Sequence, residues 1–170
     1  MCGIIGIASN KPVSMNIINS LKRLEYRGYD SAGLATLTNS AINEKKCSGR
    51  VEELEKILFK TPSNGDIGIG HVRWATHGIP SIVNAHPHSS EIVSVVHNGI
   101  IENSDEIKKN LEAKGIKFKS QTDTEVITLL ITEALKVKQP LDSVFSTLKK
   151  LKGSFALGII FKDYKDIIIG

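Results

Sequence analysis

Several strand-length segments of this chain are apolar on both faces, and this pattern constrains its fold more than any other feature of the sequence. Residues 32–38, 67–74 and 154–161 show it most clearly. Strands of this kind must be covered on both sides. Segments with helical apolar spacing, such as residues 51–60 and 141–151, lie between them. We therefore expect an α+β fold in which sheets stack on each other and are covered by helices.

The composition is that of one globular domain. The 170 residues are 41% hydrophobic and 24% charged, which is enough apolar material for a core. The longest apolar runs, residues 155–161 and 167–169, are far shorter than the ~20 residues of a membrane-spanning helix, so we expect no membrane association. Residues 167–170 resemble a strand that would continue, and we expect a chain truncated at its C-terminus.

Charge and cysteine content narrow the function classes further. The formal net charge is +4, but the lysines are mixed with acids on the expected helix faces and few aromatics separate them. We therefore expect no nucleic-acid binding. The two cysteines, Cys2 and Cys47, do not form a disulfide framework, and the chain does not open with a basic secretory signal. Both features are typical of a cytoplasmic protein.

The beginning of the chain supplies a candidate nucleophile. If Met1 is removed, Cys2 carries both a thiol and a free α-amine. The unperturbed pKa of an α-amine is about 7.7–8.0, so its neutral fraction can accept the thiol proton near physiological pH. If Met1 is kept, the amine sits on the wrong residue. A lone cysteine in an apolar strand is more often a small buried hydrophobe, and Cys2 alone does not decide between these interpretations.

Further along the chain, three polar positions complement Cys2. Arg73 ends an expected strand, where a guanidinium can bind a carboxylate through two parallel hydrogen bonds. Asp123 falls in the first turn of an expected helix and could bind an ammonium group. Asn98-Gly99 offers an amide donor and an unhindered backbone N–H for an oxyanion. Together they suit an amino acid such as glutamine, although each alone is more often a strand-end ion pair, a helix-dipole acid or a hairpin turn.

Two other polar segments have structural interpretations. Residues 75–90 form a long irregular stretch, and loops of this length are often functional. Within it, His86-Pro87-His88 lacks a recognised metal-ligand spacing, so we expect no metal and no cofactor. Thr122 and Glu125 have the spacing of a capping box at the start of a helix.

Six blocks of the sequence, in this order, resemble the class II glutamine amidotransferase domain. They are residues 2–6 (CGIIG), 21–33 (LKRLEYRGYDSAG), 70–78 (GHVRWATHG), 84–88 (NAHPH), 97–103 (HNGIIEN) and 122–125 (TDTE). Within this family the sequences of these blocks are most similar to those of the aminotransferases that convert fructose 6-phosphate to glucosamine 6-phosphate. One alternative is another class II member, of the kind that serves phosphoribosyl pyrophosphate or asparagine synthesis. The other is a module that binds glutamine and catalyses no reaction.

The resemblance implies an architecture. It predicts the N-terminal-nucleophile hydrolase fold, a four-layer αββα sandwich, with residues 1–170 as an incomplete glutaminase domain. The sugar-phosphate isomerase domains, which would bind fructose 6-phosphate and receive the ammonia, are absent from this chain. A homodimer is a candidate assembly of the full-length enzyme.

The resemblance also implies the chemistry. Cys2 would attack the carboxamide of L-glutamine with its own α-amine as the base. Asn98 and the Gly99 N–H would hold the tetrahedral intermediate, and water would hydrolyse the resulting thioester. Arg27 would lie near the thiol.

The same resemblance implies how glutamine would be held. Arg73 would bind the α-carboxylate with support from Thr76 and His77, and Asp123 would bind the α-amine. Trp74 would belong to a loop that closes over the substrate and gates the passage of ammonia.

Overall fold

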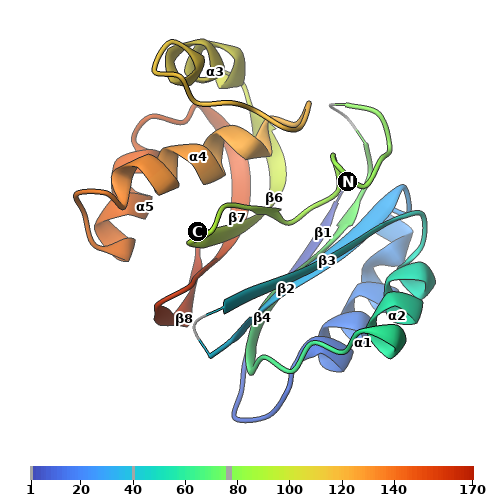
Figure 1. The fold of residues 1–170 in the computed structure, drawn as a ribbon. Coiled ribbons are helices and arrows are strands. Elements are labelled where there is room, and N and C mark those ends of the chain that lie inside the picture. The colour runs from blue at the N-terminus through green and yellow to red at the C-terminus, as the bar shows by residue number, and fades with distance from the viewer. Residues whose placement is uncertain (1, 40, 76–77) are drawn as a thin grey trace.

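Two antiparallel sheets stack face to face at the centre of the molecule (Figure 1). The computed structural model describes residues 2–39, 41–75 and 78–170. The first sheet has the strand order β1-β4-β2-β3 and consists of β1 (Gly3–Ala8), β2 (Ser31–Thr38), β3 (Ala41–Ser48) and β4 (Ile67–Arg73). The second has the order β5-β6-β7-β8 and consists of β5 (His88–Ser89), β6 (Val93–Ile101), β7 (Gly153–Phe161) and β8 (Tyr164–Ile169).

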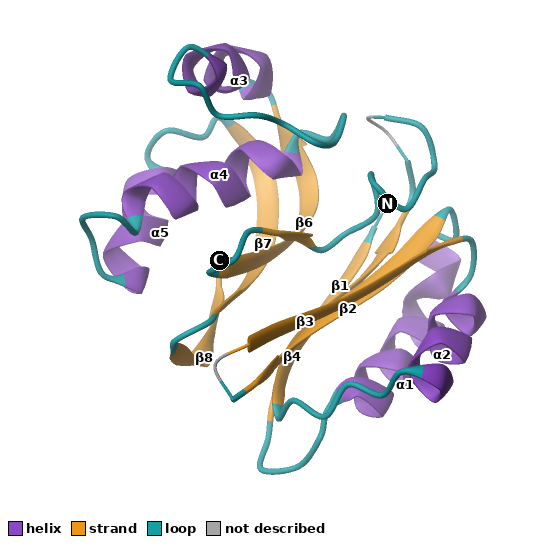
Figure 2. Cartoon of the chain, viewed as in Figure 1, coloured by secondary structure: helices purple, strands orange, loops and turns teal. Residues whose placement is uncertain are grey.

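Helices cover the outer face of each sheet (Figure 2). The first sheet is covered by α1 (Ser14–Leu24) and α2 (Val51–Lys60), and the short 3₁₀ helix η1 (Glu25–Arg27) follows α1. The second is covered by α4 (Thr124–Ala134) and α5 (Pro140–Leu148), with α3 (Ser104–Glu112) at one end. These four layers confirm the predicted αββα sandwich.

The apolar core has one cluster for each interface between layers. Ile18, Leu34 and Leu54 belong to the cluster between the first sheet and its helices. Val95, Ile127 and Leu157 belong to the cluster between the second sheet and its helices. The cluster between the two sheets includes Ala35, Ile69, Val96 and Ile160. Strands β2, β4, β6 and β7 thus bury both faces, which confirms the prediction for β2, β4 and β7.

The hairpin turn that Asn98-Gly99 would ordinarily indicate is wrong here. Strand β6 continues through both residues, and they pair with Ala156 and Phe155 of β7. Gly99 has a φ of 146°, and a Cβ there would collide with the carbonyl oxygen of Ser154. Pairing with β7 therefore overrides the local turn preference, and the missing side chain of Gly99 permits the close approach.

None of the helices within the described ranges is long and apolar enough to cross a membrane.

Candidate active site

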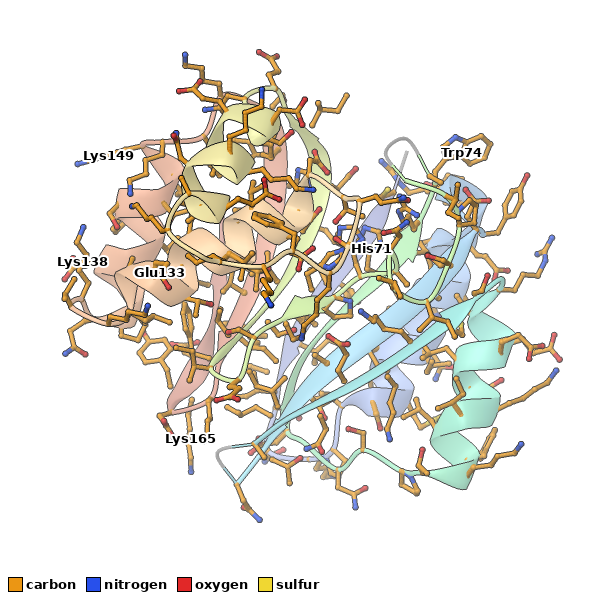
Figure 3. The ribbon with its side chains drawn as sticks, turned by 45° about the horizontal axis from the view of Figure 1, so that its top comes forward. His71, Trp74, Glu133, Lys138, Lys149 and Lys165 are labelled. Carbon is orange, nitrogen blue, oxygen red and sulfur yellow. The ribbon has the colours of Figure 1, made fainter. Side chains whose placement is uncertain are left out.

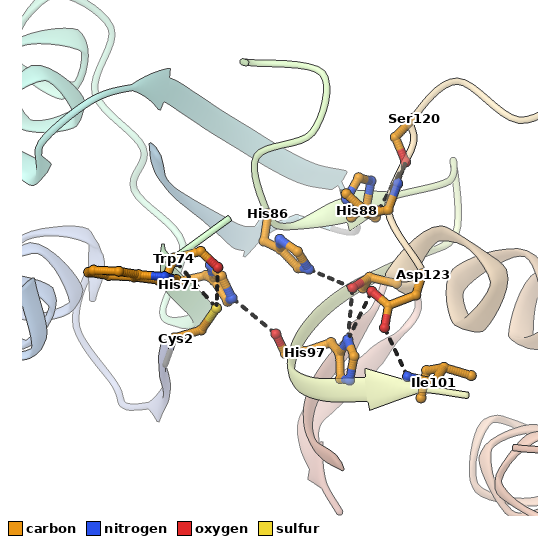
Figure 4. Close-up of polar contacts among 11 residues, drawn as sticks. Cys2, His71, Trp74, His86, His88, His97, Ile101, Ser120 and Asp123 are labelled. Carbon is orange, nitrogen blue, oxygen red and sulfur yellow. Dashed lines mark hydrogen bonds and ion pairs between the residues drawn. The ribbon is translucent and has the colours of Figure 1, made fainter. Parts of the chain in front are cut away.

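A narrow cavity opens at one end of the sandwich, where the start of β1, the end of β4, strand β6 and the start of α4 meet (Figure 4). Its lining residues come from segments far apart in the sequence. They are Cys2, Arg73, Trp74, His86, His97, Gly99, Thr122, Asp123 and Thr124. The cavity therefore combines a thiol, a cation and a carboxylate.

Cys2 lies at this cavity because of strand pairing. Gly3 of β1 pairs with Val72 of β4, which brings Cys2 beside the end of β4. The backbone N–H of Trp74 donates to Cys2 Sγ at 3.4 Å, and Arg27 Nε donates to the Cys2 carbonyl oxygen at 3.1 Å. Burial raises the pKa of the Cys2 thiol, and the Trp74 hydrogen bond and the charge of Arg73 oppose this only in part. The thiol is therefore protonated at neutral pH and needs a base to react.

The loop after η1 holds the backbone of residues 73–75, which lies next to the thiol. The Asp30 N–H donates to the Arg73 carbonyl oxygen at 3.1 Å, and the Asp30 carboxylate accepts the Ala75 N–H at 2.7 Å. Gly28 lies so close to this segment that a Cβ would be 2.5 Å from Arg73 C and 2.6 Å from Trp74 N. The loop thus holds residues 73–75 in the position from which Trp74 N–H reaches the sulfur.

Arg73 is the last residue of β4, and its side chain is buried. Its guanidinium donates to the carbonyl oxygens of Gly78 at 3.2 Å and Ile79 at 3.4 Å, so it also organises the loop that follows. Burial lowers the pKa of this guanidinium, while Cys2, Asp30 and Asp123 favour its charged form. Arginine keeps its proton under all ordinary conditions, so the cavity contains a permanent positive charge.

Asp123 supplies the opposite charge. It precedes α4, and its Oδ2 accepts the Ile101 N–H at 2.9 Å, which ties the start of α4 to the end of β6. Its Oδ1 lies 3.9 Å from His97 Nδ1 (Figure 4). A guanidinium and a carboxylate that face one cavity suit a zwitterionic α-amino acid.

The capping box predicted for Thr122 and Glu125 is wrong. Helix α4 begins at Thr124, and its N-cap makes no side-chain capping hydrogen bond. Instead the Thr122 hydroxyl bonds His88 Nε2 at 2.8 Å, and the Glu125 carboxylate accepts the N–H groups of Lys119 and Ser120. The polar side chains at the start of α4 thus fasten the helix to neighbouring segments rather than to its own first turn.

Buried histidines surround the inner end of the cavity. Thr124 Oγ1 lies 2.6 Å from His86 Nε2 and 2.8 Å from His97 Nδ1, and the ring of His71 stacks on that of His86 at 4.1 Å. Burial lowers the pKa of His71 and of His88 to about 3 and that of His86 well below its ordinary value. These three rings are therefore neutral at physiological pH. Within residues 2–39, 41–75 and 78–170, no group of three or more His, Cys, Asp or Glu side chains could hold a metal ion.

The structure brings most of the predicted site residues together. Cys2, Arg73, Trp74, Gly99 and Asp123 line the cavity. Figure 3 shows Trp74 projecting from the rim, where its side chain is 44% exposed.

Three of the predicted residues need separate comment. Asn98 is not among the residues that line the cavity. It is half-buried in β6, and strand alternation places it on the face of Val96, which packs against the first sheet. That face is directed toward the sheet that carries Cys2. Thr76 and His77 lie outside the described residues.

Sequence reasoning missed four lining residues. His86, His97, Thr122 and Thr124 were considered only as metal ligands, as a capping residue or as part of a motif. The signal that could have found them is a polar side chain within an otherwise apolar segment, since a buried polar group needs a hydrogen-bonding partner.

Comparison with protein families and sequences gives consistent results. A family model described as a glutamine amidotransferase domain matches residues 76–170. The chain is 49% identical over 171 aligned positions to a glutamine–fructose-6-phosphate aminotransferase (isomerizing) of Bradyrhizobium diazoefficiens and 51% identical to one of Brucella abortus. Each alignment covers 100% of this chain and 28% of the relative, so the chain spans a little over a quarter of the length of these relatives.

Solved structures support the fold. The glutamine phosphoribosylpyrophosphate amidotransferase of B. subtilis superimposes with a TM-score of 0.83 and 26% identity, over 95% of this chain and 35% of that one. A glutamine aminotransferase class-II domain protein from Silicibacter pomeroyi superimposes with a TM-score of 0.64 and 12% identity, over 94% of this chain and 72% of that one, which shows the fold alone. The predicted N-terminal-nucleophile amidotransferase fold is therefore confirmed.

Proposed function

This chain belongs to the class II glutamine amidotransferase domain family, and we propose on that basis that it hydrolyses L-glutamine to glutamate and ammonia through a thioester on Cys2. The observation that carries the proposal is a single cavity lined by the thiol of Cys2, the guanidinium of Arg73 and the carboxylate of Asp123. No one of these groups would be sufficient, because each also occurs in ordinary structural roles.

Recognition of glutamine follows from the two charges. The Arg73 guanidinium binds the α-carboxylate, and Asp123 binds the α-ammonium group. Trp74 at the rim covers the bound substrate. With both ends of the zwitterion held, the side-chain carboxamide is directed to the thiol, and this orientation lowers the entropic cost of the attack.

The nucleophilic step needs a base because burial raises the pKa of the Cys2 thiol. After removal of Met1, the α-amine of Cys2 accepts the thiol proton, and the sulfur forms a bond to the carboxamide carbon. The Asn98 side chain and the Gly99 N–H stabilise the oxyanion. The tetrahedral intermediate collapses when the C–N bond breaks and ammonia leaves with the proton from the amine. Water then hydrolyses the thioester to release glutamate.

The acceptor of the ammonia is suggested by the relatives. We propose that residues 1–170 are the glutaminase part of a glutamine–fructose-6-phosphate aminotransferase, whose sugar-phosphate isomerase domains use the ammonia to make glucosamine 6-phosphate. The identity of about half of all positions along the whole chain favours this assignment. Amination of a different acceptor by the full-length protein, for example phosphoribosyl pyrophosphate, would assign the chain to another branch of the family.

The test is a glutaminase assay on purified protein whose loss of Met1 has been verified by intact mass. We expect release of glutamate and ammonia in equal amounts, and a single adduct on Cys2 after treatment with a diazoketone analogue of glutamine. Cys2→Ala should abolish hydrolysis and leave glutamine binding intact.

Cys47→Ala is the matched control. Cys47 is the second cysteine of the sequence, is buried in β3 away from the cavity, and donates to the Arg50 carbonyl oxygen at 3.6 Å. This variant should keep its activity. Undiminished hydrolysis by Cys2→Ala would refute the mechanism, and glutamine binding without any turnover by the wild type would identify a binding module instead.

A further inference from the structure

A relay of buried hydrogen bonds links strand β4, which ends in Arg73, to the start of α4, which follows Asp123. Arg73 ends β4 in the first sheet, and Asp123 precedes α4 over the second. Two residues before Arg73, His71 Nε2 donates to the His97 carbonyl oxygen at 3.0 Å and thereby links β4 to β6 (Figure 4). His97 Nδ1 in turn lies 2.8 Å from the hydroxyl of Thr124, the neighbour of Asp123. The relay therefore spans the interface between the two sheets.

The hydroxyl of Thr124 has a single proton and two histidine neighbours. Thr124 Oγ1 lies between His86 Nε2 and His97 Nδ1, so it donates to one ring and accepts from the other. Asp123 Oδ1 lies 3.9 Å from His97 Nδ1, and a nearby carboxylate favours a proton on that nitrogen. His97 thus donates to Thr124, and Thr124 donates to His86.

We propose that Thr124 is a positioning residue that keeps the Asp123 carboxylate directed into the cavity, where it binds the α-ammonium group of the substrate. The inference rests on the proposed glutamine hydrolysis and names a determinant of its selectivity for the α-ammonium group. Without the Thr124 hydroxyl, the His97 Nδ1–H turns to Asp123 Oδ1. The imidazole then competes with the substrate ammonium for the same oxygen.

The effect of losing this hydroxyl should be local, because the start of α4 has other anchors. Asp123 Oδ2 still accepts the Ile101 N–H, Thr122 still bonds His88, and Glu125 still holds the backbone of the preceding segment. Removal of the Thr124 hydroxyl should therefore change the direction of one carboxylate oxygen without detaching the helix.

The experiment compares Thr124→Val, which keeps the shape and removes the hydroxyl, with Thr124→Ser, which restores it. Two quantities are measured: the kinetic constants for L-glutamine, and the inhibition constant of glutarate, which has carboxylates and no ammonium. We expect Thr124→Val to raise KM for glutamine about tenfold with kcat within about threefold of wild type, the pattern of a binding interaction lost equally in the ground state and the transition state. The inhibition constant of glutarate should stay within about twofold, and Thr124→Ser should return KM toward wild type.

Thr128→Val is the matched control. Thr128 is one turn further along α4, is equally buried, and donates to the His88 carbonyl oxygen at 3.2 Å without lining the cavity. Its KM should be unchanged. If Thr124→Val does not fold, Thr124→Ala provides the second variant, because it also removes the hydroxyl that bonds His97 Nδ1 and should produce the same ammonium-specific loss.

Three results would overturn the inference. The first is an unchanged KM in Thr124→Val. The second is an equal weakening of the binding of glutamine and of glutarate in that variant, since a general structural defect does not distinguish the two ligands. Both results require a wild type that hydrolyses glutamine, so they leave the proposed function standing. A wild type that neither binds nor hydrolyses glutamine would overturn the proposed function and this inference together.

Discussion

Mild acid should destabilise this protein strongly because its interior contains neutral histidines. Burial lowers the pKa of His71 and of His88 to about 3, whereas histidine in an unfolded chain titrates near pH 6.5. Between these values the unfolded state binds protons that the folded state excludes. The free energy of unfolding is therefore at its full value above pH 6.5 and falls as the pH decreases toward 3.

The magnitude can be worked out from this difference. A pH of 5 is about 1.5 units below the pKa of histidine in the unfolded chain, whereas each of these histidines is still neutral in the folded protein. This difference lowers the free energy of unfolding by about 2 kcal/mol for each histidine. His71 and His88 together should thus lower the free energy of unfolding by about 4 kcal/mol between pH 7 and pH 5. The total for a domain is typically about 5–15 kcal/mol. His86, whose pKa burial also lowers, contributes in the same direction.

Urea denaturation at pH 7, 6 and 5 measures this slope. His71→Gln and His88→Gln are the test variants, since glutamine retains polar atoms and cannot take up a proton. Each should reduce the slope below pH 6 by about 1.4 kcal/mol per pH unit, whatever it does to the stability at pH 7. A free energy of unfolding that is constant from pH 7 to 5, or a slope unchanged in the double variant, would refute the reasoning.

Two further predictions concern residues next to those that line the cavity. Gly28→Ala should cost about 1–3 kcal/mol of stability and lower glutaminase activity, because its Cβ must displace the backbone of Arg73 and Trp74; a wild-type melting temperature and activity would contradict this. Asn98→Ala should lower kcat by about 10²–10³ with little change in KM if its amide stabilises the oxyanion. A steady-state assay separates these constants, and a change in KM alone would exclude that role.

Local patterns were sufficient to predict most of the elements. Helix α2 has the predicted bounds, and β2, β4 and β7 occupy the segments that were predicted to be strands apolar on both faces. The layered architecture also followed, because strands that are apolar on both faces must be covered on both sides. These predictions depend on the side chains of consecutive residues, and the sequence contains that information directly.

The predictions that failed concern residues whose partners are distant in the chain. Asn98-Gly99 has the composition of a turn, but pairing with β7 keeps it in a strand. Thr122 and Glu125 have the spacing of a capping box, but their side chains bond His88 and the backbone of Lys119. In both cases the tertiary partner outweighs a local preference of about 1 kcal/mol.

The sequence by itself determined which chemical groups the site can use: a thiol next to the chain start, one guanidinium, one carboxylate and an Asn-Gly pair. The tertiary structure alone decided that Cys2, Arg73 and Asp123 line one cavity, because β1 pairs with β4 and the start of α4 packs across from them. It also decided that His71 and His86 are neutral, since burial and not residue type lowers their pKa. Long-range pairing and desolvation depend on the whole packed chain, and a short stretch of sequence carries neither.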